Sequence, residues 1–184
     1  DKGVAAALFM AVARSLIRGN AVASSGPMDT IRQANRLMLM ENSDSGMFVT
    51  VYYTIFEHGG QATGVNAGHN CPLHYRSAQD IVDWLPRGGR AMGWFEEMPL
   101  EAIPITLDEG DVLVYYTDGL TEAENAQGAA FGEDRLAALV QEAASQGYNA
   151  QDILDGILAA VDNFVGDAPP FDDLTLVVVR YIGE

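Results

Sequence analysis

Basic residues are scarce in this sequence. Lysine and arginine together number 10, against 26 aspartates and glutamates, and the formal net charge is −16 over 184 residues. Nucleic acids and anionic membrane surfaces are bound through lysine and arginine, so this balance argues against both as partners. Two explanations of the acidic excess stay open: the carboxylates keep the protein soluble, or some of them converge on a cation.

Cysteine and long apolar runs are also missing. Cys71 is the only cysteine, which excludes an intramolecular disulfide and agrees with a reducing, cytoplasmic location. Its neighbours Asn70 and Pro72 favour a small packing residue over a nucleophile. No apolar run reaches the roughly 18–20 residues that a membrane-spanning helix requires, so we expect no direct membrane contact from this segment.

The periodicity of the apolar residues predicts both helices and strands. Helical spacing covers residues 4–18, 27–41, 133–146 and a segment that opens at Asn149, with Asp152 placed as in a capping box. Strand-like runs cover residues 47–56, 61–69, 73–76, 81–85, 100–107, 112–117 and 174–179, with a hairpin turn at Gly59-Gly60. Two helices, an antiparallel meander, two more helices and a last strand indicate one α+β domain of layered helices and sheets.

Aspartates stand at the ends of two of these strands. Asp118-Gly119 follows the strand 112–117, and Asp172-Asp173 precedes the strand 174–179. If the two strands are antiparallel neighbours, the carboxylates meet at one sheet edge, where they would favour a hard cation such as Mg²⁺ or Mn²⁺. Gly119 would let the backbone turn sharply or approach a ligand closely. An ordinary Asx turn at each place is the alternative, and spacing alone favours it.

Other candidate chemistry is weaker. His69, in a short strand-to-strand connection, is a candidate base, but a structural imidazole fits that position better. His58 and His74 are the only other histidines, and none of the three forms a zinc-binding spacing with Cys71. Neither a nucleophile elbow nor a catalytic triad can be assembled from the sequence.

Five stretches together resemble a known family. In chain order they are KGVAAALFMA (residues 2–11), MFVT (47–50), NAGHN (66–70), GDVLVYYTDGLTEA (110–123) and FDDLTL (171–176). This set is similar to the bacterial stage-II-sporulation-E/RsbU (SpoIIE/RsbU) type of serine/threonine phosphatase, a branch of the PPM (PP2C-like) superfamily. The match covers essentially the whole chain, and five ordered motifs make it specific.

The resemblance implies a fold and a metal centre. The fold would be an α-β-β-α sandwich of two antiparallel sheets flanked by helices. Two Mg²⁺ or Mn²⁺ ions would activate a water to attack a phosphoserine or phosphothreonine, with no covalent intermediate. By motif, Asp118 and Asp172 match metal ligands, and Gly119 and Asp173 lie beside them.

One departure from the family concerns the start of the chain. In relatives, a Gly-Asp element precedes the Lys2-Gly3 pair, and its aspartate bridges the metals. Asp1 matches the variable residue just before that pair. We therefore expect a single phosphatase domain over residues 1–184 that is incomplete at its N-terminus and lacks its first strands and at least two ligands. Metal affinity should then be weak.

The resemblance also suggests a biological setting. Relatives form the C-terminal output domain of bacterial signalling regulators, including two-component response regulators, behind a covalently linked sensor or receiver domain. Their usual substrate is a phosphorylated anti-sigma-factor antagonist. A Mg/Mn-dependent phosphoprotein phosphatase is thus the first hypothesis. A catalytically inactive module that binds a partner is the second, and a structural cation-binding domain is the third; the sequence leaves a homodimer open.

Overall fold

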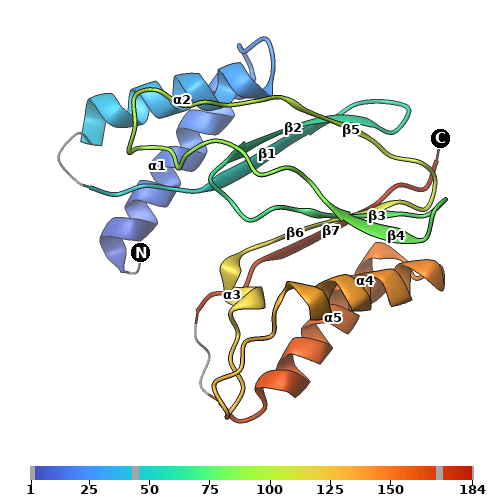
Figure 1. Ribbon diagram of the computed structural model, residues 1–184. Helices are drawn as coiled ribbons and strands as arrows, with labels where there is room; N and C mark the ends of the chain where they lie inside the picture. Colours follow the sequence, from blue (N-terminus) through green and yellow to red (C-terminus); the bar gives the residue numbers. More distant parts are fainter. Residues whose placement is uncertain (1–2, 43–45, 169–171, 184) are drawn as a thin grey trace. The chain divides into compact units, whose positions relative to one another are not determined.

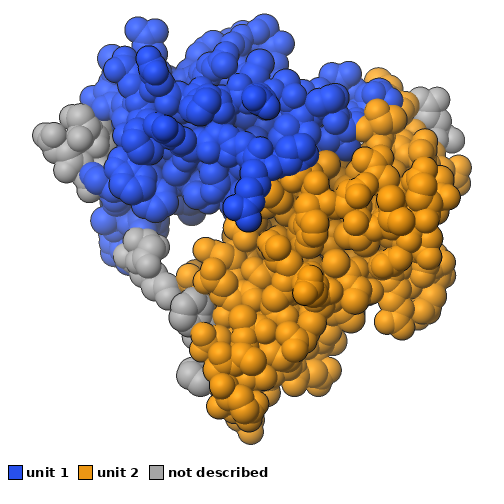
Figure 2. All heavy atoms as spheres, in the orientation of Figure 1, with its two compact units in different colours: residues 1–57, 61–69, 86–105 blue, residues 58–60, 70–85, 106–184 orange. Residues whose placement is uncertain are grey.

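The computed structural model describes residues 3–42, 46–168 and 172–183. Asp1 lies outside the described residues, as do Lys2 and Phe171 of the motifs quoted above. The chain divides into two compact units (Figure 2). Unit 1 comprises residues 1–57, 61–69 and 86–105, and unit 2 comprises residues 58–60, 70–85 and 106–184. A single domain over residues 1–184 stays a prediction.

Unit 1 combines two helices with an antiparallel sheet (Figure 1). Its elements are α1 (Val4–Ala21), α2 (Pro27–Asn42), β1 (Val51–Phe56), β2 (Gln61–Ala67) and β5 (Ile103–Thr106), and the strand order is β1-β2-β5. The β1–β2 pair runs in register from Val51 opposite Ala67 to Phe56 opposite Ala62. Gly59 and Gly60 both have positive φ, at 68° and 71°, in the predicted hairpin turn, a conformation that glycine adopts without strain.

The core of unit 1 lies between these helices and the sheet. Its buried members are Phe9, Ala13, Ile31, Ala34, Met38, Val65, Ala67, Met92, Met98 and Leu100. Buried Asn35 of α2 ties the 86–99 stretch to this core, because its side chain donates to the Phe95 carbonyl and accepts from the Gly93 N–H, each at 2.8 Å. One buried amide thus contributes two of the hydrogen bonds that hold a connection of irregular sequence.

Helix α1 departs from one expectation. By length and composition alone it could cross a membrane, although no membrane-spanning run was expected. This is weak evidence, because core helices of soluble proteins and signal sequences satisfy the same criterion. Within α1, Phe9 and Ala13 are buried, whereas Val4 and Leu8 are 78% and 64% exposed.

Unit 2 is built on a sheet of order β4-β3-β6-β7, antiparallel throughout. Its elements are β3 (Leu73–Arg76), β4 (Ile81–Trp84), β6 (Val112–Tyr116), α3 (Asp118–Thr121), α4 (Glu133–Ser145), α5 (Ala150–Val165) and β7 (Leu176–Arg180). Helices α4 and α5 lie side by side along one face of this sheet (Figure 1). The Asn149 side chain accepts from the N–H groups of Gln151 and Asp152, which confirms the predicted cap of α5.

The alternation along the strands of unit 2 decides which side chains meet the helices. Leu73, Tyr75, Val112, Val114 and Tyr116 share a core with the apolar faces of α4 and α5, which supply Leu136, Val140, Ile153, Ile157 and Val161. Successive strand residues point to opposite faces, so His74 and Leu113 lie on the other face, and both are buried.

The predicted elements are present, with shifted ends. The expected α+β class, with two antiparallel sheets and helices on them, is confirmed. Strand β7 begins at Leu176 rather than at residue 174, because the Thr175 N–H bonds the Thr117 side chain instead of a ladder carbonyl. Residues 47–50, predicted to begin a strand, instead contribute an isolated bridge between Val49 and Met92. The one-turn helix α3 was not expected.

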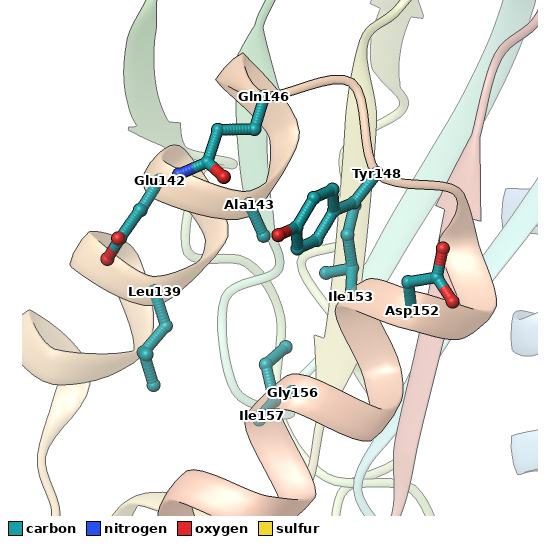
Figure 3. Close-up of a pocket in the computed structure, with 9 residues that line it drawn as sticks. All are labelled: Leu139, Glu142, Ala143, Gln146, Tyr148, Asp152, Ile153, Gly156 and Ile157. Atoms are coloured by element: carbon teal, nitrogen blue, oxygen red, sulfur yellow. The ribbon is translucent and has the colours of Figure 1, made fainter.

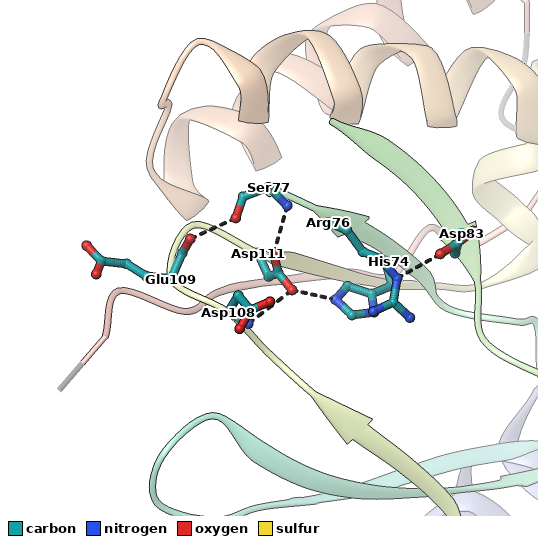
Figure 4. Close-up of polar contacts among 7 residues, drawn as sticks. All are labelled: His74, Arg76, Ser77, Asp83, Asp108, Glu109 and Asp111. Carbon is teal, nitrogen blue, oxygen red and sulfur yellow. Dashed lines mark hydrogen bonds and ion pairs between the residues drawn. The ribbon is translucent and has the colours of Figure 1, made fainter. Parts of the chain in front are cut away.

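A buried histidine–aspartate pair anchors the start of β6 (Figure 4). His74 Nε2 lies 3.0 Å from Asp111 Oδ2, and both side chains are almost fully buried. Asp111 also accepts from the N–H groups of Ser77, at 2.8 Å, and Asp108, at 3.2 Å. This carboxylate therefore joins β3, the turn after it and the turn before β6. His74 Nδ1 is buried without a hydrogen-bond partner among residues 3–42, 46–168 and 172–183, and Nε2 is the ring nitrogen that donates to the Asp111 carboxylate.

We expect Asp111→Ala to lower the free energy of unfolding by about 2–3 kcal/mol, because it strands the buried His74 donor and two backbone N–H groups. Asp83→Ala is the matched control. It removes only the half-exposed ion pair with Arg76, so its cost should stay below about 1 kcal/mol. Urea unfolding of both variants measures the difference. Equal losses would show that the buried pair contributes no more than the exposed one.

Candidate metal centre

The predicted meeting of two aspartate-bearing segments is confirmed. Strands β6 and β7 are antiparallel neighbours, and their register ends with Tyr116 opposite Leu176. Beyond the ladder, the Thr117 N–H donates to the Thr175 carbonyl at 3.1 Å, and the Thr175 N–H donates to Thr117 Oγ1 at 3.0 Å. The segments that carry Asp118 and Asp172 therefore leave the sheet at the same edge.

Gly119 lies directly against the second segment. A Cβ atom at this position would be 2.4 Å from the Asp173 carbonyl oxygen and 3.0 Å from its carbon, closer than real contacts allow. Its φ lies outside the left-handed region, so a glycine is needed here for space and not for backbone conformation. The sequence suggested a sharp turn or close approach to a ligand. The structure shows close approach to the protein's own backbone.

The two candidate ligands each accept a hydrogen bond from the next residue's backbone N–H. Asp118 Oδ1 accepts the N–H of Gly119 at 2.9 Å, and Asp172 Oδ1 accepts the N–H of Asp173 at 2.8 Å. Both aspartates are exposed. Each carboxylate is thus oriented by the next peptide while it remains accessible to solvent. Asp173 is also exposed, and its carbonyl oxygen packs against Gly119.

Helix α3 fixes the position of Asp118. The Asp118 carbonyl accepts the Glu122 N–H at 2.8 Å and so closes the single turn. Leu120, in the middle of that turn, is completely buried in the core of unit 2. The turn that begins at Asp118 is therefore held by core packing as well as by its hydrogen bonds.

Tyr116 secures the strand just before the site. Its hydroxyl donates to Glu133 Oε1 at 3.0 Å, at the start of α4, and the side chain is 2% exposed. Burial raises the pKa of the Tyr116 phenol, and the hydrogen bond to the Glu133 carboxylate raises it further. The phenol therefore stays a neutral donor at physiological pH and keeps β6 tied to α4.

The donor set fits a hard cation only in part. Exposed carboxylate oxygens are the ligands that Mg²⁺ and Mn²⁺ prefer, and Asp118 and Asp172 supply them from adjacent segments. Within residues 3–42, 46–168 and 172–183, no group of three or more His, Cys, Asp or Glu side chains could hold a metal ion. The pair therefore fits as part of a ligand set, and Asp173 does not extend it to three.

The other residues considered from the sequence lie elsewhere. His69 belongs to unit 1, where its Nδ1 is 3.0 Å from Thr50 Oγ1. The Asn66 side chain donates to the His69 carbonyl and accepts from the His69 N–H. That agrees with the structural role favoured for it. Cys71 is half-buried. The short strand around His74 gives no sequence signal for its burial against Asp111.

Comparison with known proteins gives one family. The model for stage II sporulation protein E (SpoIIE) matches residues 1–182. Protein IcfG of Synechocystis sp. is 28% identical over 207 residues, covering 97% of this chain and 32% of its own length. Phosphoserine phosphatase RsbU of Bacillus subtilis is 26% identical over 182 residues, covering 97% of this chain and 52% of its own length. The chain thus spans about a third and about half of these two relatives.

Solved structures show the same fold. The SiaA-PP2C domain of Pseudomonas aeruginosa matches with a TM-score of 0.82 at 23% identity, over 97% of this chain and 71% of that one. The RsbU and RsbW domains of Rv1364c from Mycobacterium tuberculosis match with a TM-score of 0.73 at 21% identity, over 99% of this chain and 49% of that one. The fold is therefore PP2C-like.

We expect Gly119→Ala to lower the free energy of unfolding by about 1–3 kcal/mol, because the added methyl group would push the Asp173 backbone away. The same shift should weaken Mn²⁺ binding about tenfold by moving Asp172 relative to Asp118. Urea unfolding and calorimetric Mn²⁺ titration of the full-length protein measure the two effects. Gly19→Ala is the control, because a Cβ there meets nothing within 4 Å. Gly119→Ala behaving like this control would contradict the close contact.

Proposed function

Because the chain belongs to the stage II sporulation protein E (SpoIIE) family, we propose that it is a metal-dependent protein serine/threonine phosphatase domain. The PP2C-like fold and the RsbU relative, named a phosphoserine phosphatase, support this reaction class. One observation carries the proposal: Asp118 and Asp172, the two positions that match metal ligands by motif, are brought to one sheet edge by the contact between Gly119 and Asp173.

In the proposed reaction, Asp118 and Asp172 would help to hold Mg²⁺ or Mn²⁺ through carboxylate oxygens. When bound, such ions supply Lewis-acid activation of a water and neutralise charge on the phosphoryl oxygens. The Gly119 N–H holds Asp118 Oδ1, which orients the carboxylate before any ion arrives. Asp172 is oriented in the same way by the Asp173 N–H. With two aspartates supplied here, further ligands would have to complete the coordination of two ions.

The proposed substrate is a phosphorylated anti-sigma-factor antagonist, a small protein that carries phosphoserine or phosphothreonine. The RsbU relative and the solved chain that holds RsbU and RsbW domains support a partner-switching context. We propose a cytoplasmic output domain linked to an N-terminal sensor or receiver domain. The acidic surface, at a net charge of −16, is consistent with a protein rather than a nucleic acid partner.

The second candidate is a catalytically inactive module of the same fold that acts by binding a partner. It is favoured by one observation, namely that the described residues hold no three-ligand group around Asp118 and Asp172. The two candidates differ in a measurable way. An enzyme requires the carboxylates for turnover, whereas a binding module would tolerate their replacement by asparagine.

We expect the full-length protein to hydrolyse p-nitrophenyl phosphate and a phosphorylated antagonist protein only with Mn²⁺ or Mg²⁺. Asp118→Asn and Asp172→Asn should each lower kcat/KM by about a hundredfold or more. Loss of residues that merely support ligands already costs 10–100-fold in typical metal sites, and a direct ligand should cost at least as much. Asp162→Asn, an exposed residue of α5 with the same charge change, should leave the rate unchanged.

A phosphatase assay with a metal titration measures this prediction. If both asparagine variants turn over at the parent rate, the proposed ligand roles are wrong. If no metal-dependent hydrolysis occurs while the antagonist still binds, the inactive module is the better description.

A further inference from the structure

A groove opens between the two helices of unit 2, apart from the aspartate pair. It has a volume of about 190 Å³ and is lined by residues of α4, α5 and the loop between them. The apolar floor includes Ile153 and Ile157, each 1% exposed, and Leu139 of α4. Figure 3 shows the Tyr148 side chain among the lining residues, with its hydroxyl directed toward α4. Tyr148 is 48% exposed.

Gly156 is the unusual residue of this groove. It stands in the interior of α5, where glycine is a poorer helix former than alanine. Glycine in a helix is explained when another chain segment packs too closely for a methyl group, but a Cβ at Gly156 would meet nothing within 4 Å. No packing within the described residues therefore requires glycine here. The absence of a side chain at Gly156 leaves the groove open.

The polar rim of the groove is acidic. Glu142 of α4 and Asp152 of α5 line opposite sides, and neither forms an ion pair within the described part of the chain. Helices α4 and α5 together carry six acidic residues and a single basic one, Arg135, which is directed at the Phe131 carbonyl and the Phe164 ring. Arg180 reaches the loop end of the groove, where it donates to the Tyr148 carbonyl.

We propose that the groove between α4 and α5 docks a basic, amphipathic segment of a partner protein. An apolar side chain of that segment would enter beside Gly156, over Ile153 and Ile157, and its lysine or arginine neighbours would face Glu142 and Asp152. A second copy of this chain fits less well, because a two-fold contact would set one acidic rim against another. The proposal does not rest on phosphatase activity, since the groove contains neither Asp118 nor Asp172.

The test titrates the full-length protein with two synthetic helical peptides, one of leucine and lysine and one of leucine and glutamate. Methyl NMR signals of Leu139, Ile153 and Ile157 report binding in the groove. We expect the lysine peptide to shift these signals and the glutamate peptide to leave them unmoved. Gly156→Leu should lower the affinity for the lysine peptide by about ten- to a hundredfold, because it fills the space in which one large apolar side chain would be buried.

A matched pair of charge reversals tests the rim. Glu142→Lys should lower the affinity for the lysine peptide several-fold more than Asp162→Lys does. Asp162 lies on α5 outside the groove, and its replacement makes the same change in net charge. Gly156→Ala tests the groove without destabilising the fold. It should raise the melting temperature by about 2–4 °C and still weaken binding of the lysine peptide.

Three results would overturn the proposal. They are equal binding of the two peptides, unchanged affinity in Gly156→Leu, and concentration-dependent self-association that Glu142→Lys abolishes. The last result would assign the groove to a second copy of the chain.

Discussion

The contact between Gly119 and the Asp172-Asp173 backbone is the constraint on which the candidate site depends. It places two segments, far apart in sequence, closer than any side chain on residue 119 would allow. Strand β6, which leads into Asp118 and Gly119, is held in place at both of its ends. Asp111 ties its start to His74 and the turn at Ser77, while Tyr116 ties its end to Glu133 of α4. The helices of unit 2 thus position the aspartates indirectly, through the strand they cover.

Much of this arrangement could be predicted from sequence because it follows from local rules. Period-two and helical spacing located the strands and helices, Gly59-Gly60 marked the hairpin, and Asn149 marked the start of α5. The juxtaposition of Asp118 with Asp172 was only conditional, since it requires β6 and β7 to be sheet neighbours. Which strands lie next to each other in a sheet is a long-range property. It cannot be predicted from the spacing of apolar residues along the chain. Family resemblance supplied what spacing could not.

Three features escaped sequence reasoning for physical reasons. The role of Gly119 depends on a through-space contact with residue 173 and not on its own φ angle. His74 lies in a short strand whose alternation is compatible with either face, so its burial opposite Asp111 was not evident. The pattern typical of Asp-Gly is a turn, whereas Asp118–Thr121 forms the one-turn helix α3, with Leu120 buried in the core. Each case is decided by tertiary packing.

The sequence leaves two explanations of the acidic composition open. In the structure, acidic residues lie in two distinct settings. Glu142 and Asp152 border a groove on the helical layer, whereas Asp118 and Asp172 are each oriented by the following N–H at a shared sheet edge. Solubility alone explains dispersed surface carboxylates, but it gives no reason to orient two of them on segments that close contact forces together. Like charges exposed on neighbouring segments repel one another weakly in water, and a cation bound by both carboxylates would remove that repulsion. An edge built on backbone contact, with carboxylates oriented outward, is therefore consistent with the cation binding proposed for Asp118 and Asp172.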